Sequence, residues 1–194
     1  PPKLTVEARL AALLDPDSFV EVEAARIGVT TGERAAVPGD GVLTGHGTIH
    51  GNRVFVFAQD FAVLGGTFGQ VHADKILRLM SLAERVGSPV IGLYDSGGAR
   101  IQEGALALDA CGALFRQISR LSGVVPQISV ILGPCAGAAA YAPALSDVVF
   151  MVRGVSSLYL TGPDVVVAVT GERVTTQDLG GADVHGGRSG VATF

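Results

Sequence analysis

Two glycine-rich stretches of this sequence could hold a negatively charged oxygen through backbone groups. "DSGGAR" (95–100) follows the apolar run "VIGLY", and "PCAGAAAY" (134–141) follows the apolar run "QISVIL". Each pattern is typical of a strand that turns into a helix and leaves backbone N–H groups free. The candidate donors are Gly98 and Ala99 in the first turn, and Gly137 and Ala138 in the second. Converging donors would form an oxyanion hole, in which each donor contributes about 3–4 kcal/mol at a transition state.

The same small residues could instead serve only to make tight strand-to-helix turns. Glycine is the default residue for such turns, and for either stretch alone this structural explanation is sufficient. Two such turns on successive strand–helix units favour a shared site, because ligands bind at the carboxyl ends of strands in α/β layers. At the level of these patterns both explanations stay open.

Side chains near the two turns offer further chemistry, each with a structural alternative. Cys135 stands where a nucleophile could stand, with Ser96 and Ser146 as lesser candidates. No histidine and acid can be paired with them from the sequence, so a hydrolase is a minor option. Candidate general bases, which are also common at helix flanks, are Asp95, Glu103 and Asp109. Arg100 could neutralise an anionic ligand or form a salt bridge within the fold.

Other functional classes find no support in the sequence. There is no GxGxxG or GxxxxGK[ST] motif, and the four histidines (46, 50, 72 and 185) and two cysteines (111 and 135) lack metal-ligand spacing, so we expect no metal site. A net charge of −4 without basic clusters disfavours nucleic-acid binding. No apolar run reaches membrane-spanning length, and the first residues lack a secretory signal pattern. We therefore expect a soluble, cytoplasmic protein.

The elements that must position these turns are predicted by the hydrophobic patterns. Residues 4–20 suggest an amphipathic helix with Thr5 as N-cap and with Glu7 and Arg9 facing water. Strand patterns cover 20–24 and 41–61, the latter a hairpin that turns at 50–52. Next come a glycine turn and helix (65–87), a strand (90–94), a helix (101–121), a strand (127–133), a turn (134–137) and a short helix (138–147). The rest of the pattern predicts strands at 148–153 and 156–160, and short helices and loops over 161–181. This alternation predicts an α/β fold with a parallel, helix-covered sheet.

Four ordered motifs carry a family resemblance. "QDFAVLGGTFGQVHADKI", "GLYDSGGARIQEG", "GPCAGAAAYAPALSD" and "LTGPDVVVAVTGE", with the opening "KLTVEARLAALLDPDSF", resemble the carboxyltransferase (β) subunits of biotin-dependent acyl-CoA carboxylases of the propionyl-CoA and acetyl-CoA carboxylase type. The resemblance runs from about Lys3 to Ala192. It implies a crotonase-like (ClpP/crotonase) spiral of ββα units. Because family subunits hold two such units, residues 1–194 are expected to form an N-terminal carboxyltransferase domain of a truncated chain without the C-terminal one.

The resemblance also implies an activity, namely transfer of a carboxyl group from carboxybiotin to the α-carbon of an acyl-CoA through an enolate. It places the oxyanion hole at the four backbone donors named above and an acyl-CoA wall at Gly65, Gly66, Thr67 and Phe68, with Arg100 nearby. The implied partners are a biotin carboxylase and biotin carboxyl carrier subunit and further copies of the chain. The biotin is carried by the partner, and no metal is implied in this domain.

One departure and two rival functions accompany the resemblance. The family commonly has "AGGA" where this chain has Ala136–Ala139, and Ala138 keeps its donor only if its φ stays negative. A biotin-dependent acyl-CoA decarboxylase subunit would share the same motifs. A catalytically incomplete binding or assembly module is the alternative from another class.

Overall fold

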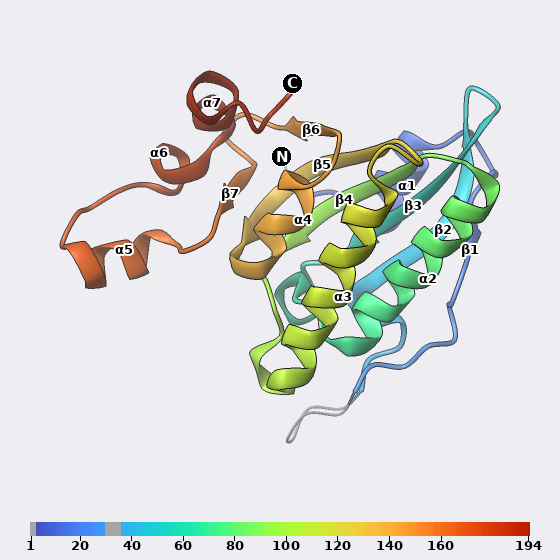
Figure 1. Ribbon diagram of the computed structural model, residues 1–194, viewed down its shortest axis with the longest axis horizontal. Helices are drawn as coiled ribbons and strands as arrows, with labels where there is room; N and C mark the ends of the chain where they lie inside the picture. The colour runs from blue at the N-terminus through green and yellow to red at the C-terminus, as the bar shows by residue number, and fades with distance from the viewer. Residues whose placement is uncertain (1–2, 30–35) are drawn as a thin grey trace.

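The computed structural model describes residues 3–29 and 36–194, which build a seven-stranded sheet (Figure 1). The strands run in the order β1-β2-β3-β4-β5-β6, and β7 pairs with the end of β5 beyond β6. Their bounds are β1 Val20–Glu21, β2 Val42–Ile49, β3 Asn52–Gln59, β4 Val90–Ser96, β5 Gln127–Ala136, β6 Val148–Met151 and β7 Ser157–Tyr159. The pairs from β3 onward are parallel, whereas β1, β2 and β3 are antiparallel. The predicted parallel layer is therefore confirmed for only part of the sheet.

The antiparallel part is the predicted hairpin. Ile49 pairs with Asn52, and both residues between them, His50 and Gly51, have positive φ. Such a two-residue turn matches the right-handed twist of the flanking strands. The predicted hairpin is thus confirmed, with a turn of two residues in place of the predicted 50–52, because Asn52 already belongs to β3.

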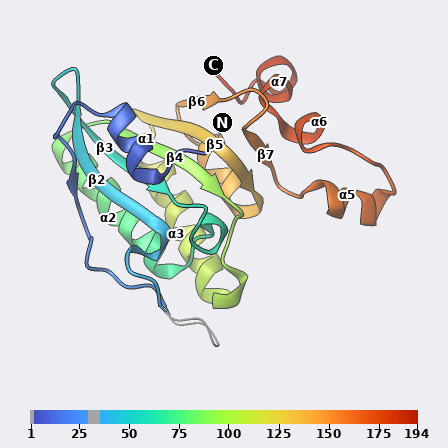
Figure 2. The same ribbon diagram turned by 180° about the vertical axis from the view of Figure 1, so that it is seen from behind.

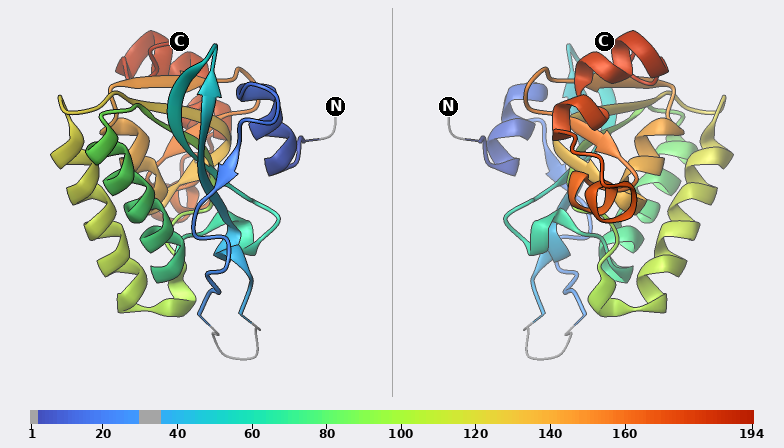
Figure 3. Two further views of the ribbon diagram at one scale, coloured as in Figure 1. Left: turned by 90° about the vertical axis from the view of Figure 1, so that its right-hand side faces the viewer. Right: turned by 90° about the vertical axis from the view of Figure 1, so that its left-hand side faces the viewer.

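Two long helices cover one face of the sheet and a short helix covers the other. In Figure 3, α2 (Gln70–Val86) and α3 (Ala105–Leu121) lie together on one side, and α1 (Val6–Leu13) lies on the opposite side. Figure 2 shows α1 across β3 and β4 from behind. The larger core cluster joins the sheet to α2 and α3, and a second cluster joins it to α1. Each helix therefore buries one apolar stripe against strands, as amphipathic helices do.

The first helix differs from its prediction in two respects. Its N-cap is Thr5 as expected, and the Thr5 hydroxyl accepts a hydrogen bond from the Ala8 N–H. The helix ends at Leu13, well before residue 20. Arg9, expected to face water, is buried and forms an ion pair with Asp95. The prediction for Arg9 was wrong because its partner is distant in sequence.

Short turns of tight helix precede β2 and follow β3, β4 and β5. They are η1 Gly39–Gly41, η2 Leu64–Gly66, η3 Ile101–Glu103 and η4 Gly137–Ala140. β5 continues to Ala136, so the turn predicted at 134–137 begins only at Gly137. The helix predicted to begin at Ile101 begins at Ala105, after η3. The first change lengthens the strand beneath its turn, and the second shortens the helix.

The last third of the chain forms small elements beside β5. They are α4 Tyr141–Ala144, α5 Pro163–Thr170, α6 Thr176–Gly180, α7 Ala182–Val184 and a π-helical turn, His185–Ser189. In Figure 1, α5 extends away from the sheet, and none of its residues is buried. Within the described ranges, 3–29 and 36–194, no helix combines the length and the apolar character required to cross a membrane.

Candidate active site

Backbone hydrogen bonds join the turn after β3 to the turn after β4. The Gly97 N–H donates to the Gly65 carbonyl (2.9 Å), and the Phe68 N–H donates to the Gly98 carbonyl (3.0 Å). The Arg100 N–H in turn donates to the Phe68 carbonyl (2.9 Å). Phe68 and Ala99 thus form an isolated parallel bridge. The sheet ladder continues locally beyond the named strands and fixes the two turns against each other.

Glycine at position 98 lets the turn after β5 approach the turn after β4. Its φ of +111° is a conformation that other residues rarely adopt. A Cβ at this position would lie 2.8 Å from the Ala136 carbonyl oxygen and 3.6 Å from the Ala138 nitrogen. The two predicted donor turns are therefore neighbours, although some forty residues separate them in sequence.

The four candidate donor groups differ in their surroundings. The Gly98 N–H already donates to the Ser96 hydroxyl (3.1 Å). Gly137 has a φ of +58°, and Ala138 is not among the described non-glycine residues with positive φ. Ala138 lies in η4, so its methyl group is compatible with the backbone at the start of a tight helix. Ala138 therefore meets the condition stated for the Ala136–Ala139 stretch, namely that its φ is not positive.

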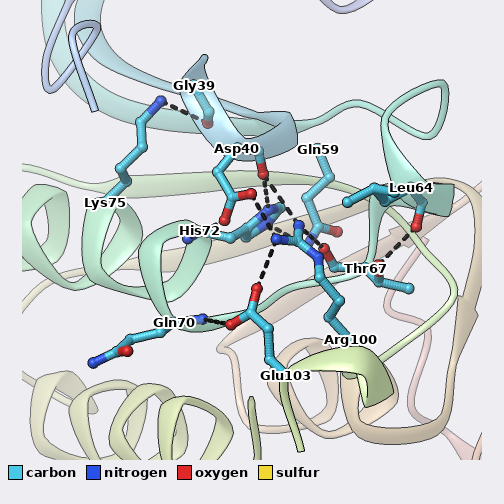
Figure 4. A network of polar contacts seen from close by, with 10 residues as sticks. All are labelled: Gly39, Asp40, Gln59, Leu64, Thr67, Gln70, His72, Lys75, Arg100 and Glu103. Carbon is cyan, nitrogen blue, oxygen red and sulfur yellow. Dashed lines mark hydrogen bonds and ion pairs between the residues drawn. The ribbon is translucent and has the colours of Figure 1, made fainter. Parts of the chain in front are cut away.

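Arg100 lies at the centre of a buried polar network (Figure 4). Its Nη1 contacts Asp40 Oδ1 (2.6 Å) and Glu103 Oε1 (2.9 Å), and its Nη2 donates to the Thr67 carbonyl (2.6 Å). The residue is only 1% exposed. Burial raises the pKa of the Asp40 carboxyl, and the bonds from Arg100 offset only part of that effect. The guanidinium thus bonds to groups within the fold. This favours the interpretation of Arg100 as a salt-bridge residue over that of a ligand-binding residue.

Glu103 joins this network to the start of α2. Its Oε2 accepts from the Gln70 N–H (2.8 Å), a backbone group that the helix itself leaves without a partner. Its Oε1 lies where a side chain at Gly69 would have to stand. Glu103 is therefore a structural cap for another helix, and its carboxylate is not a free general base.

A neutral histidine and a lysine lie on the buried side of α2 and contact Asp40 and the adjacent Gly39, respectively. The His72 Nδ1–H donates to the Asp40 carbonyl (2.9 Å), and the Gln59 side-chain amide donates to His72 Nε2 (3.3 Å). Burial lowers the pKa of His72 to about 3, so the ring is uncharged at neutral pH. The Lys75 ammonium donates to the Gly39 carbonyl (3.0 Å), and burial lowers its pKa.

Sequence reasoning missed the roles of His72 and Lys75, although a signal was available. They precede buried Ile76 and Leu79, respectively, by four positions, so they belong to the apolar face of α2. A polar side chain on such a face requires a partner from elsewhere in the fold. Here the partners come from η1 and β3, whose sequences give no sign that they contact α2.

The candidate nucleophiles are not supported. Cys135 is fully buried, its thiol donates to the Ala139 carbonyl (3.2 Å), and burial raises its pKa. Ser146 donates to the Pro143 carbonyl (2.7 Å), and Asp109 is exposed on α3. In the part of the chain that the structure describes, no group of three or more His, Cys, Asp or Glu side chains could hold a metal ion.

The proposed acyl-CoA wall divides into two kinds of residue. Gly65 and Thr67 are partly exposed at the turn after β3, whereas Gly66 is buried. A Cβ at Gly66 would overlap the Asp95 carbonyl oxygen, so only glycine fits there. Phe68 is 1% exposed and belongs to the main core. Gly66 and Phe68 thus support the turn, and Gly65 and Thr67 form its accessible surface.

The chain is similar in sequence to several known proteins. A family model described as the carboxyl transferase domain matches residues 2–194. The chain is 51% identical over 195 residues to the methylmalonyl-CoA decarboxylase subunit alpha of Veillonella parvula, covering 99% of this chain and 38% of that protein. It is 52% identical over 196 residues to the mitochondrial propionyl-CoA carboxylase beta chain of Homo sapiens, covering 98% and 36%. The chain spans less than two fifths of the length of these curated relatives.

Solved structures show the same likeness. A transcarboxylase 12S structure with methylmalonyl-coenzyme A bound superposes with a TM-score of 0.94 at 47% identity, covering 98% of this chain and 37% of that one. A Pseudomonas malonate decarboxylase hetero-tetramer gives a TM-score of 0.89 at 28% identity, with 98% and 75% covered. These similarities confirm the expected α/β, crotonase-like fold class.

Proposed function

This chain belongs to the carboxyl transferase domain family, and from that premise we propose that it binds an acyl-CoA and supports transfer of a carboxyl group from carboxybiotin to the acyl α-carbon. The observation that carries the proposal is the contact between the turns after β4 and β5, where Gly98 lies against Ala138. Propionyl-CoA and acetyl-CoA are the proposed substrates. The human relative is named a propionyl-CoA carboxylase beta chain, which supports this choice.

The proposed chemistry needs stabilisation of an enolate oxygen more than it needs an acidic or basic side chain. Removing the α-proton of a thioester places negative charge on its carbonyl oxygen, and fixed backbone N–H donors stabilise that charge. Carboxybiotin, held by a partner protein, would supply the carboxyl group as CO₂, and the biotin ureido nitrogen left behind would accept the α-proton. Such chemistry does not require Glu103 or Cys135 as a base or nucleophile. This agrees with the structure, in which both side chains are buried and already hydrogen-bonded.

Among the four proposed donors, Ala99 and Ala138 are the best placed. The Gly98 carbonyl and the Arg100 N–H both point toward Phe68. Because successive residues of an extended chain point their backbone groups to opposite sides, the Ala99 N–H points away from Phe68. The turn that holds Ala138 lies next to Gly98, the neighbour of Ala99. The Gly98 N–H is bonded to Ser96, so Gly98 serves mainly to allow the close approach, and Gly137 stays a candidate donor.

We extend the proposal to the rest of the acyl-CoA site. Gly65 and Thr67 would contact the ligand directly, while Gly66, Phe68 and Arg100 would hold that wall from behind. Residues 1–194 would act as the N-terminal carboxyltransferase domain of a longer assembly, completed by a C-terminal domain, further copies of the chain and a biotin carboxylase and carrier subunit. A hexamer assembly is named for transcarboxylase 12S, which supports the oligomer. We also propose a cytoplasmic location.

A second candidate function is biotin-dependent decarboxylation of an acyl-CoA. The relatives from Veillonella parvula and Propionigenium modestum are named methylmalonyl-CoA decarboxylase subunits, at 51% and 50% identity. The two reactions use the same enolate and differ in direction. Two incubations with a biotin-carrying partner distinguish them. Loss of label from carboxyl-labelled methylmalonyl-CoA follows decarboxylation, and transfer of label from labelled carboxybiotin to propionyl-CoA follows carboxylation.

Isothermal titration with propionyl-CoA tests the oxyanion assignment. We expect the chain to bind and Ala138→Pro, which removes one donor, to bind about tenfold more weakly, as for loss of one hydrogen bond. Ala138→Gly keeps the donor and should bind like the parent chain. The matched control is Ala105→Pro at the first position of α3, where proline is tolerated.

Two outcomes would contradict the proposal in different ways. Absence of binding by the parent chain would favour the incomplete binding or assembly module. Equal binding by the Ala138→Pro variant would leave acyl-CoA binding intact but reject Ala138 as a donor.

A further inference from the structure

Asp95 is a fully buried carboxylate whose cationic partners both come from the first residues of the chain. Lys3 Nζ lies 2.7 Å from Oδ1 and 2.6 Å from Oδ2, and Arg9 Nη2 lies 2.9 Å from Oδ2. Arg9 is almost completely buried, and the Lys3 side chain is 43% exposed. Lys3 also lies over the Phe61 ring, 4.6 Å from its centroid. We call Lys3, Arg9 and Asp95 the N-terminal clamp.

The clamp lies at the point where β4 and β5 change register. Tyr94 pairs with Ile131, but Ser96 pairs with Cys135, so β5 contains extra residues between the two pairs. Gly133 belongs to this irregular stretch, and a Cβ there would overlap Asp95 Oδ1 and lie 2.8 Å from Lys3 Nζ. The carboxylate and the ammonium therefore occupy the space that Gly133 leaves. Such irregularities bend a strand and redirect the turn after it.

Asp95 is also connected to both neighbouring turns through its backbone. Its N–H donates to Gln59 Oε1 (3.2 Å), and its carbonyl oxygen packs directly against Gly66. The next residue, Ser96, accepts the hydrogen bond from the Gly98 N–H. A displacement of Asp95 would therefore move the turn that presents Gly98 and Ala99, and would alter its distance from Ala138.

We infer that Lys3 and Arg9 are positioning residues, which hold the backbone donors of the proposed oxyanion hole in place through the carboxylate of Asp95. Without these cations a buried carboxylate lacks compensation for its lost hydration, so it must move toward water or bind a proton. Either change displaces the end of β4. The inference adds positioning residues to the proposed site. It rests on the proposed function only where acyl-CoA binding is measured.

The test compares Lys3→Met, Arg9→Met and the double variant Arg9→Met/Asp95→Asn with a matched control, Arg53→Met, at an exposed position of β3. Methionine keeps much of each side chain's length without its charge, and asparagine removes the charge that Arg9 compensates. The measurements are the ¹⁵N–¹H signals of Gly97, Gly98 and Ala99, taken without ligand, and propionyl-CoA titration.

We expect Lys3→Met and Arg9→Met to shift these amide signals, and Arg9→Met to weaken propionyl-CoA binding about tenfold, an effect typical of coupled neighbouring groups. The double variant should recover most of that loss. If folded Lys3→Met shows the same amide signals as the parent chain and Arg53→Met, the inference is overturned. Because Lys3 is only half-buried, this variant provides the test even if Arg9→Met does not fold. If the parent chain does not bind propionyl-CoA, the proposed function fails, and the amide signals still decide the clamp.

Discussion

His72 is a neutral imidazole in the native chain because its surroundings offer one acceptor, one donor and no exposure to solvent. The Asp40 carbonyl accepts its Nδ1–H, and the Gln59 amide donates to Nε2. A second proton at Nε2 would face that amide group and the nearby Arg100 and Lys75 cations. The neutral form is therefore part of the fold.

This arrangement predicts a pH dependence of stability. Between about pH 6.5, the ordinary pKa, and about pH 3, the pKa in the fold, the unfolded chain binds a proton that the native chain does not. The free energy of unfolding should therefore fall with decreasing pH in this window, by up to about 1.4 kcal/mol per pH unit from His72 alone, and should be unaffected by His72 above it. Urea unfolding of His72→Gln should show a weaker decline between pH 6 and 4, a range chosen inside the window of about 3 to 6.5.

The control for that experiment is His50→Asn, at an exposed residue of the hairpin turn with positive φ, which asparagine tolerates. It should keep the decline of the parent chain. An identical decline in His72→Gln and the parent would show that His72 does not cause the effect.

Individual residues show what could be predicted from the sequence at this scale and what could not. The location of Gly98 and Ala138 in turns after strands was predictable, because glycine and alanine after an apolar run are a local pattern. The burial of Arg9 and Arg100 was not predictable, since it depends on Asp95 and Asp40, each about 60 to 90 residues away along the chain. A charge whose partner is that distant carries no local sign of being buried.

At the scale of elements, glycine serves two opposite purposes in this chain. Gly112 lies in α3, where a Cβ would meet nothing within 4 Å, and it lowers helix stability without a packing benefit. Gly98 lies between two turns at a φ of +111° that a side chain would strain. The same substitution should therefore have opposite effects at these positions.

We predict that Gly112→Ala raises the free energy of unfolding by about 1 kcal/mol. We predict that Gly98→Ala lowers it by about 1–3 kcal/mol and weakens propionyl-CoA binding, since its methyl group would contact the Ala136 carbonyl. Urea unfolding at neutral pH measures both. Stabilisation by Gly98→Ala would contradict the close approach of the two turns.

The elements themselves were largely predictable where their pattern was long and periodic. α2, α3 and the β2–β3 hairpin match the patterns of apolar residues. The end of β5 was placed too early, because Gly133 and Pro134 indicate a turn locally. In the fold, Gly133 accommodates the Asp95 carboxylate, and the strand continues to Ala136.

At the scale of the whole molecule, α5 is an exposed apolar element. Val165 and Val169 are 48% and 78% exposed, and the element extends away from the sheet (Figure 1). We predict that the double variant Val165→Thr/Val169→Thr keeps the parent's melting temperature, because neither side chain is in the core, and lowers concentration-dependent association. Sedimentation velocity over a concentration series measures the association.

The matched control is Val149→Thr, which makes the same substitution at a buried position of β6 and should lower the melting temperature. A comparable loss of melting temperature in the α5 variant would show that these valines stabilise the monomer.

The parallel pairing of β3, β4 and β5 has a consequence for folding. The β2–β3 hairpin closes through two residues, whereas Phe55 pairs with Val90, and Val90 with Gln127, only after α2 and α3 have bridged the strands. Such pairs cost loop-closure entropy before they contribute stability, so they form later than local hairpins. The turns after β3, β4 and β5 lie at the ends of these strands, so we expect the proposed site to form only after the non-local pairs have formed.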